Sequence, residues 1–265
     1  MKALEAELGK QLLIRGTKGS RKVLLTDEGM ILRKRAEEIL TLVQKAKSEV
    51  QMTDASIAGD VYIGAGETDI IRYFARAAKR MKKSCPDIRY HISSGNAQFV
   101  TEQLDKGLID FGLMYGPVDR TKYEALTLPI GDRFGVLMRR DDPLAQKEWI
   151  SPEELRDKPL ILSAQDRSEG WTVSSQIRQD VSHLNVAATY NLIFNASLMV
   201  EEGLGYAVCL DKLINTSGDS QLCFLPLRPE IVITPSIVWK RYQVFSKASE
   251  RFLQELTSVM DLPQK

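Results

Sequence analysis

The sequence predicts an α/β protein in which a short basic segment and one long helix precede two similar lobes. Strand and helix patterns alternate from Asp60 onward, one uninterrupted helical pattern covers about residues 26–53, and a cluster of cations lies ahead of it. Alternating strands and helices are typical of parallel sheets covered by helices. The alternation occurs in two sets, and we therefore expect two α/β lobes after a helical stalk.

Composition excludes several classes of protein. Of the 265 residues, 43% are hydrophobic and 27% charged, which is the globular range. The formal charge of +1 argues against a protein that coats nucleic acid over its whole surface. No apolar run approaches the roughly 18 residues of a membrane span, and no signal-peptide core is present. With an odd number of cysteines, three, we expect a cytoplasmic protein with reduced, buried thiols.

The first 25 residues predict a short helix and a small basic hairpin. The helix covers residues 3–8 and ends at Gly9, in the manner of a glycine C-cap. The hairpin strands are residues 12–14 and 23–25, joined by a turn that contains glycine. Cations without any acid occupy residues 10–22, namely Lys10, Arg15, Lys18, Arg21 and Lys22.

A single long helix is predicted next. Thr26 is a suitable N-cap, acids follow it in the first turn, and no proline interrupts the pattern up to about residue 53. Such a helix spans roughly 40 Å. Apolar residues recur at spacings of three and four, at Ile39, Leu42 or Val43, Ala46 and Val50. We expect this stripe to pack on a partner helix in a dimer; the alternative is packing on the protein's own body.

The two lobes are read from alternating strand and helix patterns. In the first lobe we expect strands at 61–63, 88–92 and 109–114, with helices at 67–83 and from Ser94 to Gly107. The second set has strands at 134–138, 160–162, 187–190, 206–210 and 236–240 and helices at 171–180 and 195–202. A final amphipathic helix is expected at 247–260.

Groupings that would support catalysis or a cofactor are weak. Gly64-Ala-Gly66 follows a strand, but Asp69 stands where a dinucleotide fingerprint needs its third glycine, and Ser93-Ser94 replaces the expected acid. The two histidines, His91 and His183, lack companions at metal-ligand spacing. We therefore expect no cofactor, no metal, no catalytic residues and no enzymatic activity.

Polar residues gather instead at strand ends and helix starts, where open α/β sheets bind ligands. Each alone is explained equally well as a helix cap or turn residue. As a group they predict a cleft between the lobes for a small polar molecule, with or without a carboxylate. The candidates are Gly66, Glu67, Thr68, Ser94, Gly95, Asn96, Tyr115, Ser163, Asn195 and Ser197.

Three segments resemble one known family. Residues 2–15, the basic turn and Leu25-Thr26-Asp27-Glu28-Gly29 resemble the DNA-binding end of LysR-type transcriptional regulators. Residues 104–113 and 195–205 resemble the effector domain of the same family. The likeness covers the chain from Lys2 to about Met260, although the lobes alone are shared with periplasmic-type solute-binding proteins.

The resemblance implies a remnant of a winged helix-turn-helix at residues 1–25, whose wing contacts DNA phosphates through Lys18, Arg21 and Lys22. It implies a linker and dimerisation helix at 26–56 and a periplasmic-binding-protein-like effector domain at 57–265. Within that domain the first lobe is expected at about 57–133 plus 241–265 and the second at about 134–240. Such a regulator forms a homodimer or tetramer, binds DNA and a small metabolite, and performs no catalysis.

The sequence departs from the family at its N-terminus. The family's first two helices and the start of its recognition helix would lie ahead of Met1, and that start of the helix reads base edges. Wing cations contact phosphates, which position a protein without specifying a sequence. We therefore expect this polypeptide to bind DNA weakly, with strong salt dependence and without base specificity. A DNA-free ligand-binding and dimerisation module is the alternative function, and a start site assigned too late competes with a truncated product as the cause.

Overall fold

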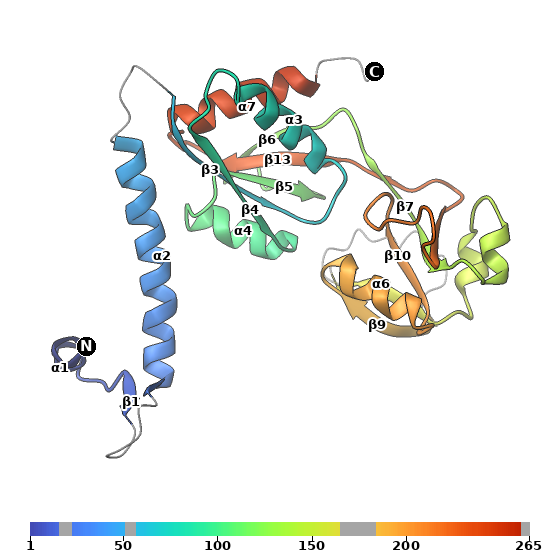
Figure 1. Cartoon of the computed structure of the whole chain (residues 1–265), viewed down its shortest axis with the longest axis horizontal. Coiled ribbons are helices and arrows are strands. Elements are labelled where there is room, and N and C mark those ends of the chain that lie inside the picture. Colours follow the sequence, from blue (N-terminus) through green and yellow to red (C-terminus); the bar gives the residue numbers. More distant parts are fainter. Residues whose placement is uncertain (16–22, 51–56, 165–183, 261–265) are drawn as a thin grey trace. The chain divides into compact units, whose positions relative to one another are not determined.

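The computed structural model describes residues 1–15, 23–50, 57–164 and 184–260 (Figure 1). The chain divides into two units, residues 1–52 and 53–265. The first unit holds a short helix, a small hairpin and the long helix, and the second holds two β-sheets with their covering helices.

The N-terminal elements are those expected from the sequence. Helix α1 (Lys2–Leu8) ends at Gly9, whose φ of 63° is the left-handed conformation that glycine adopts without strain. Strands β1 (Leu13–Arg15) and β2 (Val23–Leu25) pair antiparallel. The proposed phosphate-contacting cations Lys18, Arg21 and Lys22 lie outside the described residues.

Helix α2 (Asp27–Val50) is the predicted long helix. Its N-cap is also as predicted, because the Thr26 hydroxyl accepts a hydrogen bond of 3.0 Å from the Gly29 N–H. Among the described residues, neither α2 nor any other helix is both long and apolar enough to cross a membrane.

The sheet of the first lobe has five strands in the order β4-β3-β5-β13-β6. Strand β3 lies between β4 and β5 and runs parallel to both, as the strand–helix alternation predicts. Strand β13 runs antiparallel to β5 and β6. The strands are β3 (Gly59–Ala65), β4 (Ile88–Ser94), β5 (Phe111–Tyr115), β6 (Tyr123–Thr127) and β13 (Pro235–Lys240).

Two features of this sheet differ from the expectation. The strand expected at 236–240 in the second lobe is β13 of the first lobe, so the expected lobe boundary at residue 240 is wrong. The chain crosses back before Pro235, and Ile237 pairs with Leu113 and Leu126. Ile237 and Val238 are fully buried, because β13 is an inner strand covered on both faces. Strand β6 was not expected, since its residues lack a clear alternation of apolar and polar side chains.

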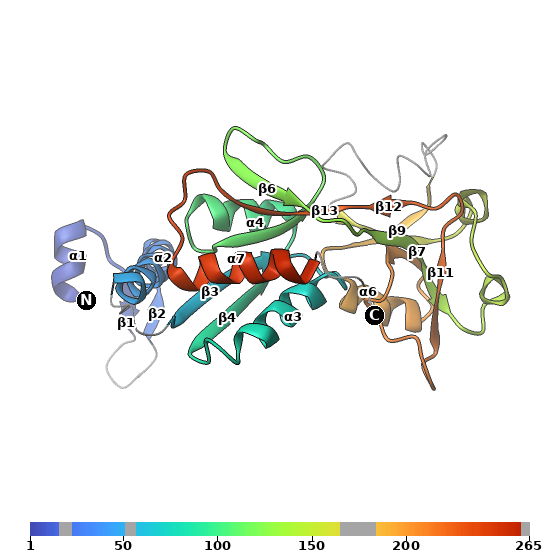
Figure 2. The same cartoon turned by 90° about the horizontal axis from the view of Figure 1, so that it is seen from above.

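Helices cover both faces of this sheet (Figures 1 and 2). Helices α3 (Ile71–Met81) and α7 (Lys247–Met260) pack together on one face, and α4 (Ala97–Asp105) covers the other. The final helix therefore covers the first lobe, as expected. Its Phe252 is fully buried, with ring centroids 5.9 Å from those of Phe74 and Phe111.

The sheet of the second lobe has the order β11-β7-β10-β8-β9, with β12 paired to β7. Helix α6 (Ile193–Glu201) packs on β7, β9 and β10. Strands β11 and β12 were not expected, and the helix expected at 171–180 lies outside the described residues. The strands are β7 (Asp132–Arg139), β8 (Leu160–Ser163), β9 (Val186–Tyr190), β10 (Tyr206–Leu210), β11 (Leu222–Pro226) and β12 (Val232–Ile233).

The aromatic contacts of α7 predict a large effect of truncating Phe252. Phe252→Ala removes a fully buried ring, which should lower the free energy of unfolding by about 3–5 kcal/mol. Ser258→Ala, on the exposed side of the same helix, should change it by less than about 0.5 kcal/mol. Urea unfolding of both variants measures the difference. Equal stabilities would show that α7 does not hold the first lobe together.

Candidate functional site

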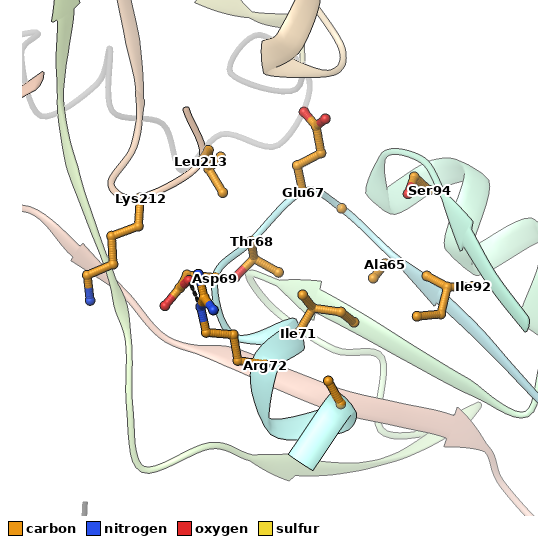
Figure 3. Close-up of a pocket in the computed structure, with 12 residues that line it drawn as sticks. Ala65, Glu67, Thr68, Asp69, Ile71, Arg72, Ile92, Ser94, Lys212 and Leu213 are labelled. Atoms are coloured by element: carbon orange, nitrogen blue, oxygen red, sulfur yellow. Dashed lines mark hydrogen bonds and ion pairs between the residues drawn. The ribbon is translucent and has the colours of Figure 1, made fainter. Parts of the chain in front are cut away.

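A pocket of about 490 Å³ opens where strand β3 ends (Figure 3). Its walls come from the β3–α3 turn, the first turns of α3, the end of β4 and the segment after β10. The lining residues are Ala65, Gly66, Glu67, Thr68, Asp69, Ile71, Arg72, Ala75, Ile92, Ser94, Lys212 and Leu213. Because residues 212 and 213 follow a strand of the second lobe, the pocket lies at the junction of both lobes.

The β3–α3 turn forms because an apolar strand ends in a polar segment. Val61, Ile63 and Ala65 are buried on one face of β3, and the Thr68 hydroxyl then accepts a 3.0 Å hydrogen bond from the Ile70 N–H. This short turn leads directly into α3, later than the expected helix start at residue 67. Backbone N–H groups at a strand-to-helix turn favour polar or anionic ligands.

A buried carboxylate lies behind this turn. Asp132, the first residue of β7, is 8% exposed, and its Oδ2 accepts a 2.5 Å hydrogen bond from the Thr68 hydroxyl. The Tyr115 hydroxyl, at the end of β5, donates to the same oxygen. Burial, together with the negative charge of Asp132, raises the pKa of Tyr115 well above its usual range, so the phenol remains a donor.

Asp132 therefore joins three separate segments: the β3–α3 turn, the end of β5 and the start of β7. It was not among the residues expected from the sequence. In the sequence, Asp132 is only an acid at the start of an apolar strand, and an ordinary turn residue has the same pattern. Only the strand pairing shows that this acid lies beside the junction of the lobes.

Glu67 reaches from the first lobe to the second. Its Oε2 accepts a 2.5 Å hydrogen bond from the N–H of Ile193, the first residue of α6. The N-cap position of α6 is held by Leu192, whose side chain makes no capping hydrogen bond. A side chain 126 positions away in the chain thus contacts the N-terminus of this helix.

The charged groups of the pocket wall balance in sign. Arg72, in the first turn of α3, is ion-paired with Asp69 of the preceding turn. Lys212 is exposed, has a backbone φ of 65°, and makes no ion pair within 4.0 Å to any residue of the described ranges. Its ammonium group is therefore available to a ligand. Figure 3 shows the Lys212 side chain extending on the same side of the pocket as Asp69 and Arg72.

Of the first-lobe residues expected at the site, Gly66, Glu67, Thr68 and Ser94 line the pocket, and Tyr115 lies behind it through Asp132. Asn96 uses its side-chain oxygen to cap α4, accepting 2.9 Å from the Phe99 N–H.

Gly95 is buried between β4 and α4. Its N–H donates 3.0 Å to the Ala65 carbonyl, and a Cβ at this position would lie 2.2 Å from the Phe99 ring. Gly95 therefore allows a close approach of the backbone to this ring.

The second-lobe candidates do not line this pocket within the described part of the chain. Ser163 ends β8, and Asn195 is exposed in the first turn of α6. Ser197 is buried, and its hydroxyl donates 2.7 Å to the Phe194 carbonyl of the same helix. The helix begins two residues earlier than expected, at Ile193, which places Ser197 in its interior.

Six further residues line the pocket and were not expected from the sequence: Ile71, Arg72, Ala75, Ile92, Lys212 and Leu213. The sequence position of Lys212 could have identified it as a candidate. It follows the strand at 206–210 at its carboxyl end, the same location that identified Thr68 and Ser94.

Helix α2 of the first unit displays the predicted apolar stripe. Ile39 is 59% exposed, Leu42 40% and Val43 41%, and Ala46 is also exposed. The side chain of Val50 lies outside the described residues. Such exposure of large aliphatic side chains along one helix face is typical of a surface that binds a partner.

Two α/β lobes with a polar pocket at their junction define the class of two-lobed ligand-binding domains. A profile of the LysR substrate binding domain matches residues 54–261, most of the chain. The chain therefore belongs to the LysR-type transcriptional regulators, with their effector-binding domain as its second unit.

Relatives agree with this assignment. The HTH-type transcriptional regulator YvbU of Bacillus subtilis (strain 168) is 27% identical over 232 residues, covering 88% of this chain and 74% of that protein. YvbU is named as a transcriptional regulator and not as an enzyme, which supports the non-enzymatic interpretation.

Solved structures share the fold. CbnR in complex with its target DNA has a TM-score of 0.73 at 16% identity, covering 98% of this chain and 88% of that chain. A full-length OxyR variant of Pseudomonas aeruginosa has a TM-score of 0.60 at 22% identity, and the match covers 100% of this chain and 87% of that chain. At these identities the likeness concerns the fold alone.

The hydrogen bond from Tyr115 to Asp132 predicts a pH-dependent stability difference. Tyr115→Phe should lower the free energy of unfolding by about 1–3 kcal/mol at neutral pH, because Asp132 loses a donor. Because folding raises the pKa of Tyr115, the protonated phenol stabilises the folded state. This stabilisation is fully present below the ordinary pKa of 10.0 and is lost as the pH rises above 10.0. The difference between wild type and Tyr115→Phe should therefore shrink above pH 10.0.

Urea unfolding at neutral pH and above pH 10.0 measures both parts of this prediction. A difference that stays constant or grows with pH would contradict the assignment of this phenol as a buried donor.

Proposed function

We propose that the protein regulates transcription in response to a small polar molecule that binds in the pocket at the β3–α3 turn. The observation that carries the proposal is the convergence of Thr68, Ser94 and Lys212, from three different segments, on one cavity of about 490 Å³. Such a volume suits a small metabolite. Hydroxyl groups, turn N–H groups and one ammonium group favour a polar molecule, with a carboxylate facing Lys212 as the preferred option.

We also propose that the regulator acts as a homodimer, or as a tetramer built from dimers, through α2. The support is the exposed stripe of Ile39, Leu42, Val43 and Ala46. Ligand binding would change the spacing of the lobes, and the dimer would transmit this change to its two DNA-binding ends.

DNA contact through Lys18, Arg21 and Lys22 remains a prediction, because these residues lie outside the described ranges. Contacts of this kind bind phosphates and carry no sequence information. We propose that these cations contribute salt-sensitive affinity and that the regulator works in the cytoplasm, where its DNA target lies.

The pocket proposal predicts which substitutions weaken ligand binding. Isothermal titration of the full chain with a panel of small organic acids should detect at least one ligand. Ser94→Ala should weaken its binding about 5- to 20-fold, the loss of one hydrogen bond. Thr68→Val should weaken it at least as much, because it also removes the hydrogen bond from Thr68 to Asp132 that holds the turn. Ser93→Ala is the matched control, because Ser93 precedes Ser94 on β4 and does not line the pocket. Unchanged affinity in both pocket variants would refute the placement.

The dimer proposal predicts a difference between two neighbouring residues of α2. Val43→Lys adds a charge within the apolar stripe and should weaken dimerisation about tenfold or more, because the ammonium would be buried without a partner. Gln44→Lys adds the same charge to an exposed residue off the stripe and should leave the dimer intact. Analytical ultracentrifugation over a concentration series measures the two constants. Equal constants would argue that α2 packs on the protein's own body.

A further inference from the structure

We infer that Glu67 is a latch between the two lobes: from the first lobe it caps helix α6 of the second, and it thereby fixes the spacing of the lobes. The inference rests on the proposed function only in taking the adjoining pocket as the effector site. Its test below requires no effector.

Helix α6 lacks a cap of its own. The N-cap residue is Leu192, and the preceding Asn191 uses its side-chain oxygen on the Leu192 N–H, at 3.0 Å. The first helical N–H, at Ile193, donates instead to Glu67. Exposed or buried, the first N–H groups of a helix need acceptors from outside the helix. Glu67 therefore supplies an acceptor that the local sequence of α6 does not.

The negative charge of Glu67 also favours this contact. A carboxylate is stabilised at the positive end of a helix, and its hydrogen bonds to N–H groups are stronger than those of neutral acceptors. Helix α6 packs on β7, β9 and β10, so a displacement of α6 requires a displacement of the second-lobe sheet. A contact at the helix terminus thus acts on the whole lobe.

The residue after Glu67 is anchored at the junction. Thr68 is buried and bonded to Asp132, at the point where β7 leaves the first lobe. Beside it, Gly131 lies so close to the returning strand that a Cβ would stand 2.6 Å from the Val232 side chain and 2.9 Å from the Ile233 carbonyl. The two crossing segments are therefore tightly packed. Loss of the Glu67 contact leaves this anchor in place and allows the second lobe to move about it.

The latch lies where a ligand would meet it. Glu67 lines the pocket together with Thr68 and Lys212, and its carboxylate is also the acceptor for α6. A bound molecule that donates to Glu67 competes with the Ile193 N–H. One side chain thereby links occupancy of the pocket to the spacing of the lobes.

The latch is tested on the ligand-free full chain with Glu67→Ala, Glu67→Gln and the control Glu148→Ala. Glu148 is an exposed glutamate of the second lobe. One measurement is amide hydrogen exchange at residues 192–195. The other is the distance between spin labels on Glu102→Cys of α4 and Asp219→Cys of the second lobe, in a Cys223→Ser background.

In Glu67→Ala, exchange at residues 192–195 should accelerate about fivefold, the loss of one cap, and the label distances should spread to a second, longer population. Glu67→Gln keeps an acceptor without the charge and should give intermediate values, while Glu148→Ala should match the wild type. Faster exchange with an unchanged distance distribution would make Glu67 a cap alone and overturn the latch. No change in either measurement would overturn both the capping role of Glu67 and the latch. Failure of the effector proposal shows separately, as an absence of binding in the calorimetric panel.

Discussion

The second unit depends on one buried carboxylate, Asp132. It accepts hydrogen bonds from Thr68 and Tyr115, which come from two segments of the first lobe, while its own strand belongs to the sheet of the second lobe. A buried carboxylate is costly unless donors satisfy it. The requirement for both hydroxyl groups fixes the β3–α3 turn, and this turn forms one wall of the pocket and places Glu67 at α6.

Much of the fold follows from local patterns. The Gly9 cap, the Thr26 cap, the long helix and the parallel strands β3, β4 and β5 were all predictable, because a cap or an apolar period is contained within a few residues. The position of β13 was not predictable from its residues. Its apolar run fits any inner strand, and its partners β5 and β6 are more than 100 positions away.

The lining of the pocket was predictable to a similar extent. Gly66, Glu67, Thr68 and Ser94 were found because strand ends meet at one edge of a parallel sheet. Asn96 and Ser197 are also polar, but their side chains bond within helices. Asn96 caps α4, and the Ser197 hydroxyl donates to the Phe194 carbonyl of α6. The hydrogen bonds of Asp132 and the contact of Glu67 with Ile193 join segments of two different lobes. A local sequence pattern carries no information about such contacts.

Amide hydrogen exchange of the full chain, with and without a ligand from the organic-acid panel, tests the coupling of the pocket to both lobes most directly. We predict that the ligand slows exchange at residues 65–69 of the turn and alters exchange at residues 192–195 of α6 in the same titration. Protection of a different surface, with both of these segments unchanged, would show that the pocket is not coupled to the two lobes.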